Sequence, residues 1–330
     1  MSILITGGLG FIGSHAVLEF SKKEEIVIVD DLSNAELTTL NHLRTLTAKN
    51  ISFYQIDIKD KTKLKKVFEK HAFSGITHFA GYKAVEESVL NPLKYYENNI
   101  QTTINLANLA LEYQVEKFIF SSSATVYGDQ KTPFKETTPL KETANPYGET
   151  KKINERILTD LAAVNDNFNV VLLRYFNPIG ADKSGLIGER PKGVPNNLMP
   201  YLTQTAKGLR KKLFIYGNDY PTVDGTGMRD YIHVTDLAIG HLKAYQYNFK
   251  GVEIFNLGTG KATSVLELVA AFERQNKINI PYQIKPRRAG DVAISYADVS
   301  KAEKLLKFKT QLSIDEMVKD AWNFEKNLPK

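Results

Sequence analysis

The sequence predicts an α/β protein with a doubly wound parallel sheet and a smaller mixed α/β domain. Three observations lead to this prediction: apolar runs of strand length alternate with helical patterns, each run is continuously apolar, and a glycine-rich turn joins the first strand to the first helix. Continuous apolar runs are typical of strands that are buried on both faces, and alternation with helices favours parallel connections. Ligands of such sheets bind at the carboxyl ends of the strands.

The first half of the chain supplies these elements in order. Residues 2–6 form an apolar run, residues 7–13 form the turn that opens a helical pattern, and residues 26–29 form a second run that ends at Asp30. The alternation continues with strand-like runs at 51–54, 76–79, 118–120 and 170–173, and with helical patterns at 61–71 and 93–113. Polar residues follow three of these strands, at 57–58, 79–83 and 121–125, so we expect a binding site at that edge.

The glycine turn predicts a Rossmann-type dinucleotide site. Gly8, Gly10 and Gly13 satisfy G-x-G-x-x-G, and Gly7 with Gly10 and Gly13 satisfies the wider G-x-x-G-x-x-G. Side chains there would block the tight turn, the approach of a pyrophosphate to backbone amides, and the packing of helix on strand. Asp30 would accept hydrogen bonds from the adenosine ribose and repel a 2′-phosphate, so NAD is favoured over NADP.

The amino-acid composition of the chain changes near residue 180, since residues 177–196 are rich in Gly and Pro. We therefore expect a first domain over residues 1–180 and a second over 181–330, with a segment near 227–260 that returns to the first. The second half shows a helical pattern at 198–208, strand-like runs at 214–216, 228–234 and 253–256, a helix from residue 236, a loop at 287–291 that includes Ala289, and a terminal helix with Trp322.

Composition excludes several classes of protein. With 42% hydrophobic and 24% charged residues the chain is typical of soluble globular proteins. No run approaches the roughly 18 apolar residues of a membrane span, and no basic stretch precedes the first apolar run, so we expect a cytoplasmic protein without membrane association. The absence of cysteine excludes disulfides, thiolate nucleophiles and Cys-based zinc sites. The six histidines show no metal-binding spacing, so no metal is expected.

The net charge of +6 raises the question of nucleic-acid binding. The densest basic cluster, residues 59–66, belongs to a predicted amphipathic helix with Leu64, Val67 and Phe68 facing inward, so its lysines form a solvated face. We expect no nucleic-acid partner. A phosphorylated small ligand would also use basic side chains.

The stretch Tyr147-Gly148-Glu149-Thr150-Lys151 is the strongest catalytic candidate. Asn145 is a good N-cap and Pro146 suits the first helical position, so Tyr147 and Lys151 lie at i and i+4 on one helical face. The apolar stripe of the same helix lies about a quarter turn away, at roughly 100° per residue, so we expect the pair to border a packed surface without being buried.

This spacing suits a general base. A tyrosine has a pKa of about 10, and lowering it by three units takes roughly 4 kcal/mol. One ammonium about 5 Å away supplies roughly 3 kcal/mol at an effective dielectric constant near 20. A positively charged nicotinamide would supply the remainder. Tyr147 could then take a hydroxyl proton while hydride leaves for NAD⁺, and Ser123, at a strand end, could relay that proton.

Other interpretations of these residues exist. Y-x-x-x-K also occurs by chance as a surface pair, but the glycine turn, Asp30 and the serine-rich strand end favour catalysis. For His233 beside Tyr231, packing is favoured over a ligand contact. Local features leave open whether Arg229, Arg288 and Asp291 are surface charges or ligand contacts.

At these residues the chain resembles the extended short-chain dehydrogenase/reductase family, and within it the UDP-hexose 4-epimerases. The resemblance covers essentially the whole chain. Besides the glycine turn and Y-x-x-x-K, it is carried by residues 79–88, 95–99, 120–128, 173–178, 195–200, 217–220 and 224–234.

The resemblance implies a role for each of three sets of residues. The catalytic set is Ser123, Tyr147 and Lys151. The NAD-binding set is Gly7, Gly10, Phe11, Ile12, Gly13, Asp30, Asn34, Asp57, Ile58, Phe79, Ala80, Lys83, Asn98, Lys151 and Phe176. The set that binds the UDP-sugar is Ser123, Tyr147, Asn177, Asn197, Leu198, Phe214, Tyr216, Arg229, Arg288, Asp291 and Ser295.

The same resemblance implies an activity. Family enzymes remove hydride and proton at C4 of UDP-glucose or UDP-galactose, let the 4-keto sugar turn over, and return the hydride to the opposite face. They retain NAD throughout and are commonly homodimers. A related epimerase acting on a UDP-uronate or UDP-pentose is the alternative enzyme, and an NAD-sensing binding protein without catalysis is the alternative from another class.

Two positions refine the expected substrate. Related dehydratases carry an Asp-Glu pair where this chain has Ser123-Ala124, so elimination of water is disfavoured. Ser295 aligns with a pocket position where some epimerases have a bulky aromatic that confines them to glucose and galactose. A small side chain there is associated with admitting an N-acetyl group, so we hypothesise that UDP-GlcNAc and UDP-GalNAc are also substrates.

Overall fold

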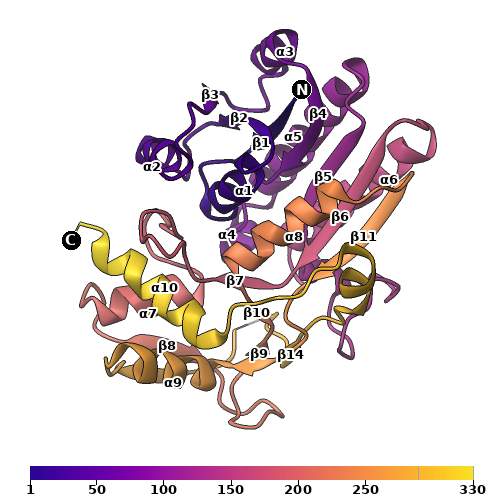
Figure 1. The fold of residues 1–330 in the computed structure, drawn as a ribbon. Helices are drawn as coiled ribbons and strands as arrows, with labels where there is room; N and C mark the ends of the chain where they lie inside the picture. The colour runs from indigo at the N-terminus through magenta and orange to yellow at the C-terminus, as the bar shows by residue number, and fades with distance from the viewer. Residues whose placement is uncertain (289, 330) are drawn as a thin grey trace.

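A seven-stranded parallel sheet forms the centre of the computed structural model, which describes residues 1–288 and 290–329 (Figure 1). The strand order is β11-β6-β5-β4-β1-β2-β3. Every neighbouring pair is parallel, so the predicted doubly wound fold is confirmed. The strands are β1 (Ser2–Thr6), β2 (Glu25–Asp30), β3 (Ser52–Gln55), β4 (Phe73–His78), β5 (Lys117–Ser123), β6 (Asn169–Tyr175) and β11 (Val252–Leu257).

Helices cover both faces of this sheet, because its strands carry apolar side chains on both sides. On one face pack α1 (Phe11–Ser21), α2 (Leu37–Thr47) and α8 (Val234–Gln246); Figure 1 shows the orange α8 beside the indigo α1. On the other face pack α3 (Lys61–Lys70), α5 (Pro92–Glu112) and α6 (Pro146–Ala163). The short α4 (Val85–Leu90) precedes α5, and a 3₁₀ turn, η1 (Ala124–Tyr127), follows β5.

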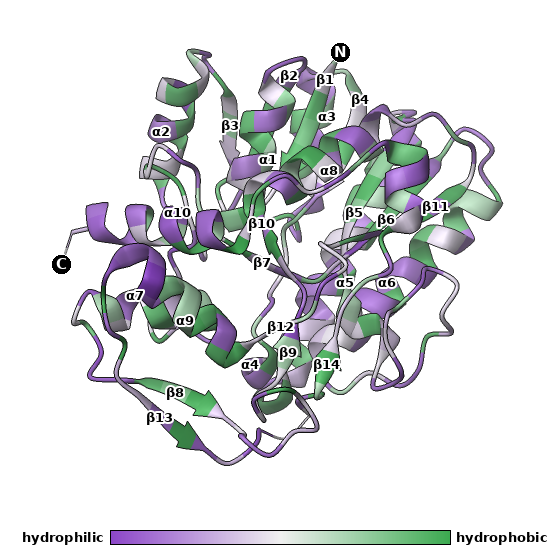
Figure 2. Cartoon of the chain, turned by 60° about the horizontal axis from the view of Figure 1, so that its bottom comes forward, coloured by the Kyte–Doolittle hydropathy of each residue, from purple (hydrophilic) through white to green (hydrophobic). Residues whose placement is uncertain are grey.

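The second half of the chain builds a smaller unit around its own core (Figure 2). Its helices are α7 (Leu198–Ala206), α9 (Val265–Asn276) and α10 (Ile314–Asn327), which contains Trp322. The π-helical turn η2 (Ala302–Leu306) packs against α8 and β11 of the central sheet. Its short strands are β7 (Asn177–Ile179), β8 (Leu213–Tyr216), β9 (Met228–Arg229), β10 (Tyr231–His233), β12 (Thr263–Ser264), β13 (Tyr282–Lys285) and β14 (Ile294–Ser295). Ala289, in the predicted 287–291 loop, lies outside the described residues.

The expectation of one continuous strand at 228–234 was wrong. The run divides at Asp230: β9 pairs with β12 and β14, whereas β10 pairs with β7 in another sheet. The Asp230 carboxylate is buried and accepts backbone N–H groups of Thr259 at 2.7 Å, Gly260 at 3.0 Å and Ala297 at 3.2 Å. An anchored carboxylate at this point separates the two strands, which a hydrophobicity pattern does not reveal.

After the first strands of the smaller unit, the chain returns to the central sheet as β11. β11 is the edge strand beside β6, in register from Val252 opposite Val170 to Leu257 opposite Tyr175. The domain limits at residues 180 and 181 stay a prediction.

Within residues 1–288 and 290–329 no helix is long and apolar enough to cross a membrane, and no three His, Asp or Glu side chains are placed to hold a metal ion.

Candidate active site

The glycine turn between β1 and α1 is packed so closely that side chains do not fit. Gly7 has φ +67°, and a Cβ there would lie 2.7 Å from the Ala80 nitrogen. A Cβ on Gly13 would lie 2.1 Å from the Gly7 carbonyl oxygen. Gly10 is the N-cap of α1 and supplies no side-chain cap, so the first amides of the helix face outward. These features leave the helix N-terminus available to a phosphate.

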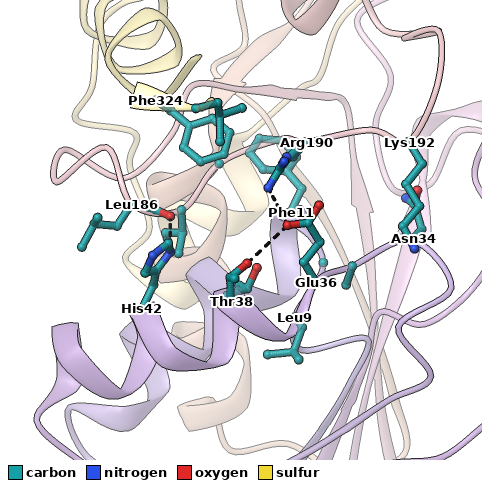
Figure 3. Close-up of a pocket in the computed structure, with 16 residues that line it drawn as sticks. Leu9, Phe11, Asn34, Glu36, Thr38, His42, Leu186, Arg190, Lys192 and Phe324 are labelled. Carbon is teal, nitrogen blue, oxygen red and sulfur yellow. Dashed lines mark hydrogen bonds and ion pairs between the residues drawn. The ribbon is translucent and has the colours of Figure 1, made fainter. Parts of the chain in front are cut away.

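Asp30 ends β2 beside this turn. One carboxylate oxygen accepts the Leu9 N–H at 3.1 Å, and the other accepts the Leu32 N–H at 2.9 Å. Burial raises the pKa of this carboxyl, and the two backbone hydrogen bonds oppose that shift. The carboxylate is therefore oriented by the backbone at the place where the sequence predicts a ribose contact. Asn34 lines a pocket here with Gly10 and Phe11 (Figure 3).

Tyr147 and Lys151 lie in the first turns of α6, as the capping residues predict. The Asn145 side chain accepts the Gly148 N–H at 2.9 Å, and Pro146 is the first helical residue. Lys151 is buried, contrary to our expectation, with 7% of its surface exposed. Its ammonium donates to the Ser121 carbonyl oxygen at 2.6 Å and lies 4.9 Å from the centre of the Phe120 ring. The helical spacing predicted which side of α6 carries Lys151. It contains no information about β5, which packs over that side chain.

The structure also corrects the account of how the base is activated. Burial raises the pKa of Tyr147 to about 12, and a hydrogen bond with Ser123 partly opposes that shift. Burial lowers the pKa of Lys151 to about 8, against the attraction of the Glu155 carboxylate. The Lys151 ammonium lies 5.9 Å from the centre of the Tyr147 ring and is directed to Ser121. The part of the pKa lowering that we expected from Lys151 is therefore not seen, because burial dominates. The part expected from a positively charged nicotinamide stays a prediction.

The three consecutive serines that end β5 fix α6 against the sheet. The Ser121 carbonyl holds Lys151, and the Ser122 hydroxyl donates to Glu155 at 2.5 Å. The Ser123 hydroxyl accepts the Thr125 N–H at 3.2 Å, which turns it into the site beside the Tyr147 phenol. The register of strand and helix therefore brings the predicted catalytic set together at the carboxyl end of the sheet.

A buried ion pair lies one helical turn beyond Lys151. Arg174, near the end of β6, donates to Glu155 through two nitrogens at 2.9 and 2.6 Å, and both side chains are almost fully buried. The guanidinium also lies over the Tyr127 ring, 4.9 Å from its centre. Removal of either partner would leave a buried charge unpaired, which costs about 3–5 kcal/mol.

Three further residues predicted to bind NAD lie at the same edge of the sheet. Phe79 and Ala80 directly follow β4, and the Ala80 nitrogen lies against Gly7. Phe176, directly after β6, is buried beside Phe134, with ring centres 6.4 Å apart.

Several other members of that set interact mainly with the chain itself. Ile58 is buried in the core, and the Asp57 carboxylate accepts the Lys59 N–H at 2.9 Å. Asn98 donates to the Asn99 side chain at 3.1 Å. Lys83 forms an ion pair with Glu189 at 2.6 Å.

The smaller unit brings five of the predicted UDP-sugar contacts together. The Asp291 carboxylate receives Arg288 at 2.9 Å and lies 3.8 Å from the Arg229 guanidinium. The Arg288 guanidinium also covers the Tyr216 ring at 4.8 Å. Ser295 on β14 is the register partner of Arg229 on β9, so it belongs to the same cluster. The two arginines give this face of the site a positive charge that suits a pyrophosphate.

The other four predicted contacts lie on nearby elements. Phe214 and Tyr216 alternate on β8, so they share one face of that strand. Asn177 begins β7, and its N–H donates to the Asp230 carbonyl at 3.0 Å. Asn197 is the N-cap residue of α7, which begins at Leu198, and its side chain donates to Glu189 at 2.7 Å.

Comparison with known proteins gives a consistent result. A family model described as GDP-mannose 4,6 dehydratase matches residues 4–321. A UDP-glucose 4-epimerase of Neisseria meningitidis serogroup A is 49% identical over 332 residues, which covers 99% of this chain and 98% of the relative. The chain belongs to the UDP-glucose 4-epimerase family. A Bacillus subtilis member of that family is 48% identical over 329 residues, covering 98% of this chain and 97% of the relative.

Solved structures of UDP-glucose 4-epimerases have the same fold. The enzyme from Bifidobacterium longum, in complex with NAD⁺ and UDP, superimposes with a TM-score of 0.96 at 46% identity and 99% coverage of both chains. The UDP-Glc/GlcNAc 4-epimerase of Campylobacter jejuni gives 0.86 at 38% identity, also with 99% coverage of both chains. The resemblance drawn from the sequence, both to the short-chain dehydrogenase/reductase family and to its 4-epimerases, is thus confirmed.

Three residues of this UDP-glucose 4-epimerase family member have site contacts that the sequence analysis missed. Glu155 and Arg174 support α6 behind the catalytic set, and Glu189 contacts both Lys83 and Asn197. Glu155 follows Lys151 by four residues, and that spacing was a signal that could have been used. Glu189 lies in a Gly- and Pro-rich stretch without periodicity, so the sequence carried no comparable signal for it.

Proposed function

We propose that this chain is an NAD-dependent epimerase that interconverts UDP-glucose and UDP-galactose at C4 through a transient 4-keto sugar. The observation that carries the proposal is the meeting of the Tyr147 phenol, the Ser123 hydroxyl and the buried Lys151 ammonium at the carboxyl end of the sheet whose first strand leads into the glycine turn. Membership of the UDP-glucose 4-epimerase family and the cluster around Arg229 support it. We assign cofactor binding to residues 1–180 and most of the sugar-nucleotide contacts to the later part of the chain.

The residues of the glycine turn fit NAD. Its close packing admits only hydrogen at Gly7 and Gly13, the open amides of α1 suit a pyrophosphate, and the oriented Asp30 carboxylate suits a ribose diol. We assign Phe79, Ala80, Lys83, Asn98 and Phe176 to the nicotinamide side and Asn34, Asp57 and Ile58 to the adenosine side. When bound, NAD accepts hydride from C4 of the sugar and returns it.

Tyr147 is assigned the role of general base and acid for the C4 hydroxyl. With a pKa of about 12, its phenol is protonated at pH 7, and a shift to near 7 requires about 7 kcal/mol of further stabilisation of the phenolate. The oxidised cofactor carries a positive charge that would act in this direction. Lys151, held by the Ser121 carbonyl, places a second positive charge 5.9 Å from the centre of the Tyr147 ring, and Ser123 orients the hydroxyl that reacts.

The substrate's diphosphate is assigned to Arg229 and Arg288, which lie together around Asp291. Tyr216 on β8 offers an aromatic face for the base, with Asn177, Asn197, Leu198 and Phe214 around the nucleotide sugar. Elimination of water needs an acid and base pair after Ser122, and Ser123-Ala124 does not provide one. We therefore propose epimerisation and not dehydration, although the matching family model is described by a dehydratase.

Ser295 supports a wider substrate range. Its small side chain lies on β14 opposite Arg229, next to the proposed diphosphate site. A hydroxymethyl group leaves more room than an aromatic ring, so we propose that UDP-GlcNAc and UDP-GalNAc are also interconverted. The structural relative from Campylobacter jejuni is described as acting on both glucose and GlcNAc forms.

A homodimer and a cytoplasmic location complete the proposal. Val89, Leu90 and Leu93 are exposed apolar side chains that follow one another along α4 and the start of α5. Apolar side chains grouped in this way are typical of protein contacts, and a second copy of the chain is the proposed partner. The lack of cysteine is in keeping with a reducing compartment.

Analysis of the small molecules bound to the purified protein tests the proposal. Denaturation should release NAD and UDP-hexose, and the intact protein should interconvert UDP-glucose and UDP-galactose without added acceptor. Turnover only of a UDP-uronate or UDP-pentose in a substrate panel would replace the proposed substrate. Bound NAD and UDP-sugar without any turnover would instead indicate a binding protein.

A further inference from the structure

Residues 186–192, here called the strap, contact α2 and the loop between β2 and α2 (Figure 3). The Leu186 carbonyl oxygen contacts His42 Nδ1 at 2.8 Å, and Arg190 forms an ion pair with Glu36 at 2.5 Å. Lys192 donates to two backbone carbonyls of the loop after β2, at 2.9 and 2.8 Å. The strap therefore lies beside the proposed adenosine site while it leads directly to α7 of the smaller unit.

Glu189 occupies the middle of the strap and faces inward. Only 9% of its side chain is exposed, although it is a carboxylate in a loop. A single oxygen, Oε1, accepts from Lys83 Nζ at 2.6 Å and from Asn197 Nδ2 at 2.7 Å. A carboxylate stays ionised in a nearly buried position only when it is paired or hydrogen-bonded. Here its partners are Lys83, which was predicted to bind NAD, and Asn197, which was predicted to bind the UDP-sugar.

The two partners come from different parts of the chain. Lys83 follows β4 at the cofactor edge, and Asn197 caps the position where α7 begins. Because they share one acceptor atom, a ligand that draws either side chain away changes the hydrogen bonding of the other. Movement of Lys83 would also leave the Glu189 carboxylate without its positive partner, and an unpaired carboxylate there would repel a diphosphate.

We propose that Glu189 is a positioning residue that couples retention of NAD to binding of the UDP-sugar, by holding Lys83 and Asn197 on one carboxylate oxygen. The inference rests on the proposed function, because the ligand assignments of both partners come from it. Coupling of this kind is reciprocal: if UDP slows the loss of NAD, NAD must strengthen the binding of UDP. Glu189 itself takes no part in the hydride or proton transfer.

The test compares Glu189→Gln with the wild-type holoprotein, using UDP as the probe. Glutamine keeps the size of the side chain and an oxygen for Asn197, but it loses the charge that pairs with Lys83. Retained NAD is measured over time by chromatography during dilution, with and without saturating UDP, and kcat and KM for UDP-galactose are measured in parallel. Arg190→Gln is the matched control, because it loosens the same strap from Glu36 and touches neither Lys83 nor Asn197.

In the wild type UDP should slow the loss of NAD, and Glu189→Gln should reduce that effect by about tenfold, the size of a typical coupling between sites. KM should rise by a similar factor, with a smaller change in kcat. Arg190→Gln should keep most of the coupling. An equal loss of coupling in both variants would assign it to the strap as a whole and overturn the role of Glu189.

Two further outcomes separate this inference from the proposed function. A wild-type protein that holds NAD and epimerises UDP-galactose, but whose loss of NAD does not respond to UDP, overturns the coupling alone. A wild-type protein without NAD or turnover overturns the proposed function and the coupling with it. Because Glu189→Gln removes no volume, a circular dichroism spectrum and melting temperature like the wild type's confirm that the comparison is between folded proteins.

Discussion

Replacement of Lys151 by methionine should abolish activity and remove the pH dependence of stability that Lys151 imposes between pH 8 and 10.5. Burial holds the pKa of Lys151 at about 8, compared with 10.5 for an ordinary lysine. At neutral pH the folded protein therefore keeps a buried ammonium whose ionisation it disfavours by about 3 kcal/mol, at 1.36 kcal/mol for each pKa unit. Methionine has a similar length and no charge, so Lys151→Met removes this penalty.

The sign of the pH dependence follows from proton binding. Between pH 8 and 10.5 the unfolded chain holds the Lys151 proton more tightly than the folded protein, so wild-type stability rises with pH in that window. Below pH 8 both states are protonated and the penalty is fully present. The stability of Lys151→Met relative to the wild type should thus be highest below pH 8 and decline by about 3 kcal/mol as the pH approaches 10.5.

Urea unfolding of both proteins, freed of bound nucleotide by the same treatment, measures this difference at pH 7.5, 9 and 10.5. The absolute difference at one pH also includes the lost hydrogen bond to the Ser121 carbonyl, worth roughly 1.5–3 kcal/mol. The change with pH reports the ionisation, because the pKa of Lys151 in the folded protein already includes the stronger hydrogen bond of the charged form. Lys152→Met, on the same helix, is the control. A difference that varies by less than about 1 kcal/mol across the range would refute the reasoning.

Three further substitutions test the site. Tyr147→Phe should lower kcat by at least about 100-fold with NAD still bound, and turnover within a few-fold of the wild type would end its assignment as the base. Ser295→Tyr should abolish activity on UDP-GlcNAc and spare UDP-galactose; a preparation active on both, measured side by side, would contradict the proposed pocket. Gly13→Ala places Cβ 2.1 Å from the Gly7 carbonyl oxygen, whereas Gly10→Ala places it at 3.3 Å. Gly13→Ala should therefore cost more stability, by about 1–3 kcal/mol, and retain less NAD; equal melting temperatures would show that the turn can relax.

The sheet, the glycine turn and the start of α6 could be predicted because local patterns encode them, whereas the assignment of most site residues to ligands rested on the family resemblance and stays a prediction. Continuous apolar runs marked the strands, and the glycine spacing and the capping residues Asn145 and Pro146 placed the turn and α6. The burial of Lys151 could not be predicted, because it depends on β5 lying over the start of α6. The break at Asp230 depends on a carboxylate that meets amides from residues 259–297, which are distant in sequence.

Glu189 marks the limit of prediction from one sequence. Its stretch has neither periodicity nor a motif, and its importance arises only where Lys83, from the other half of the chain, meets it. Arg229 and Ser295 are a similar case, since they are register partners on short strands that are far apart in the sequence. Pairings between distant segments depend on the completed fold, and local sequence contains little information about them.

The position of β11 at the edge of the sheet limits how the protein can be divided. A fragment that ends at residue 180 would contain the glycine turn and the catalytic residues but would leave β6 without the partner that covers Val170 to Tyr175. An unpaired apolar edge strand is a template for association with other chains. Truncation at this boundary should therefore yield an aggregating fragment, and a segment covering β11 supplied as a separate chain would be the natural partner for complementation.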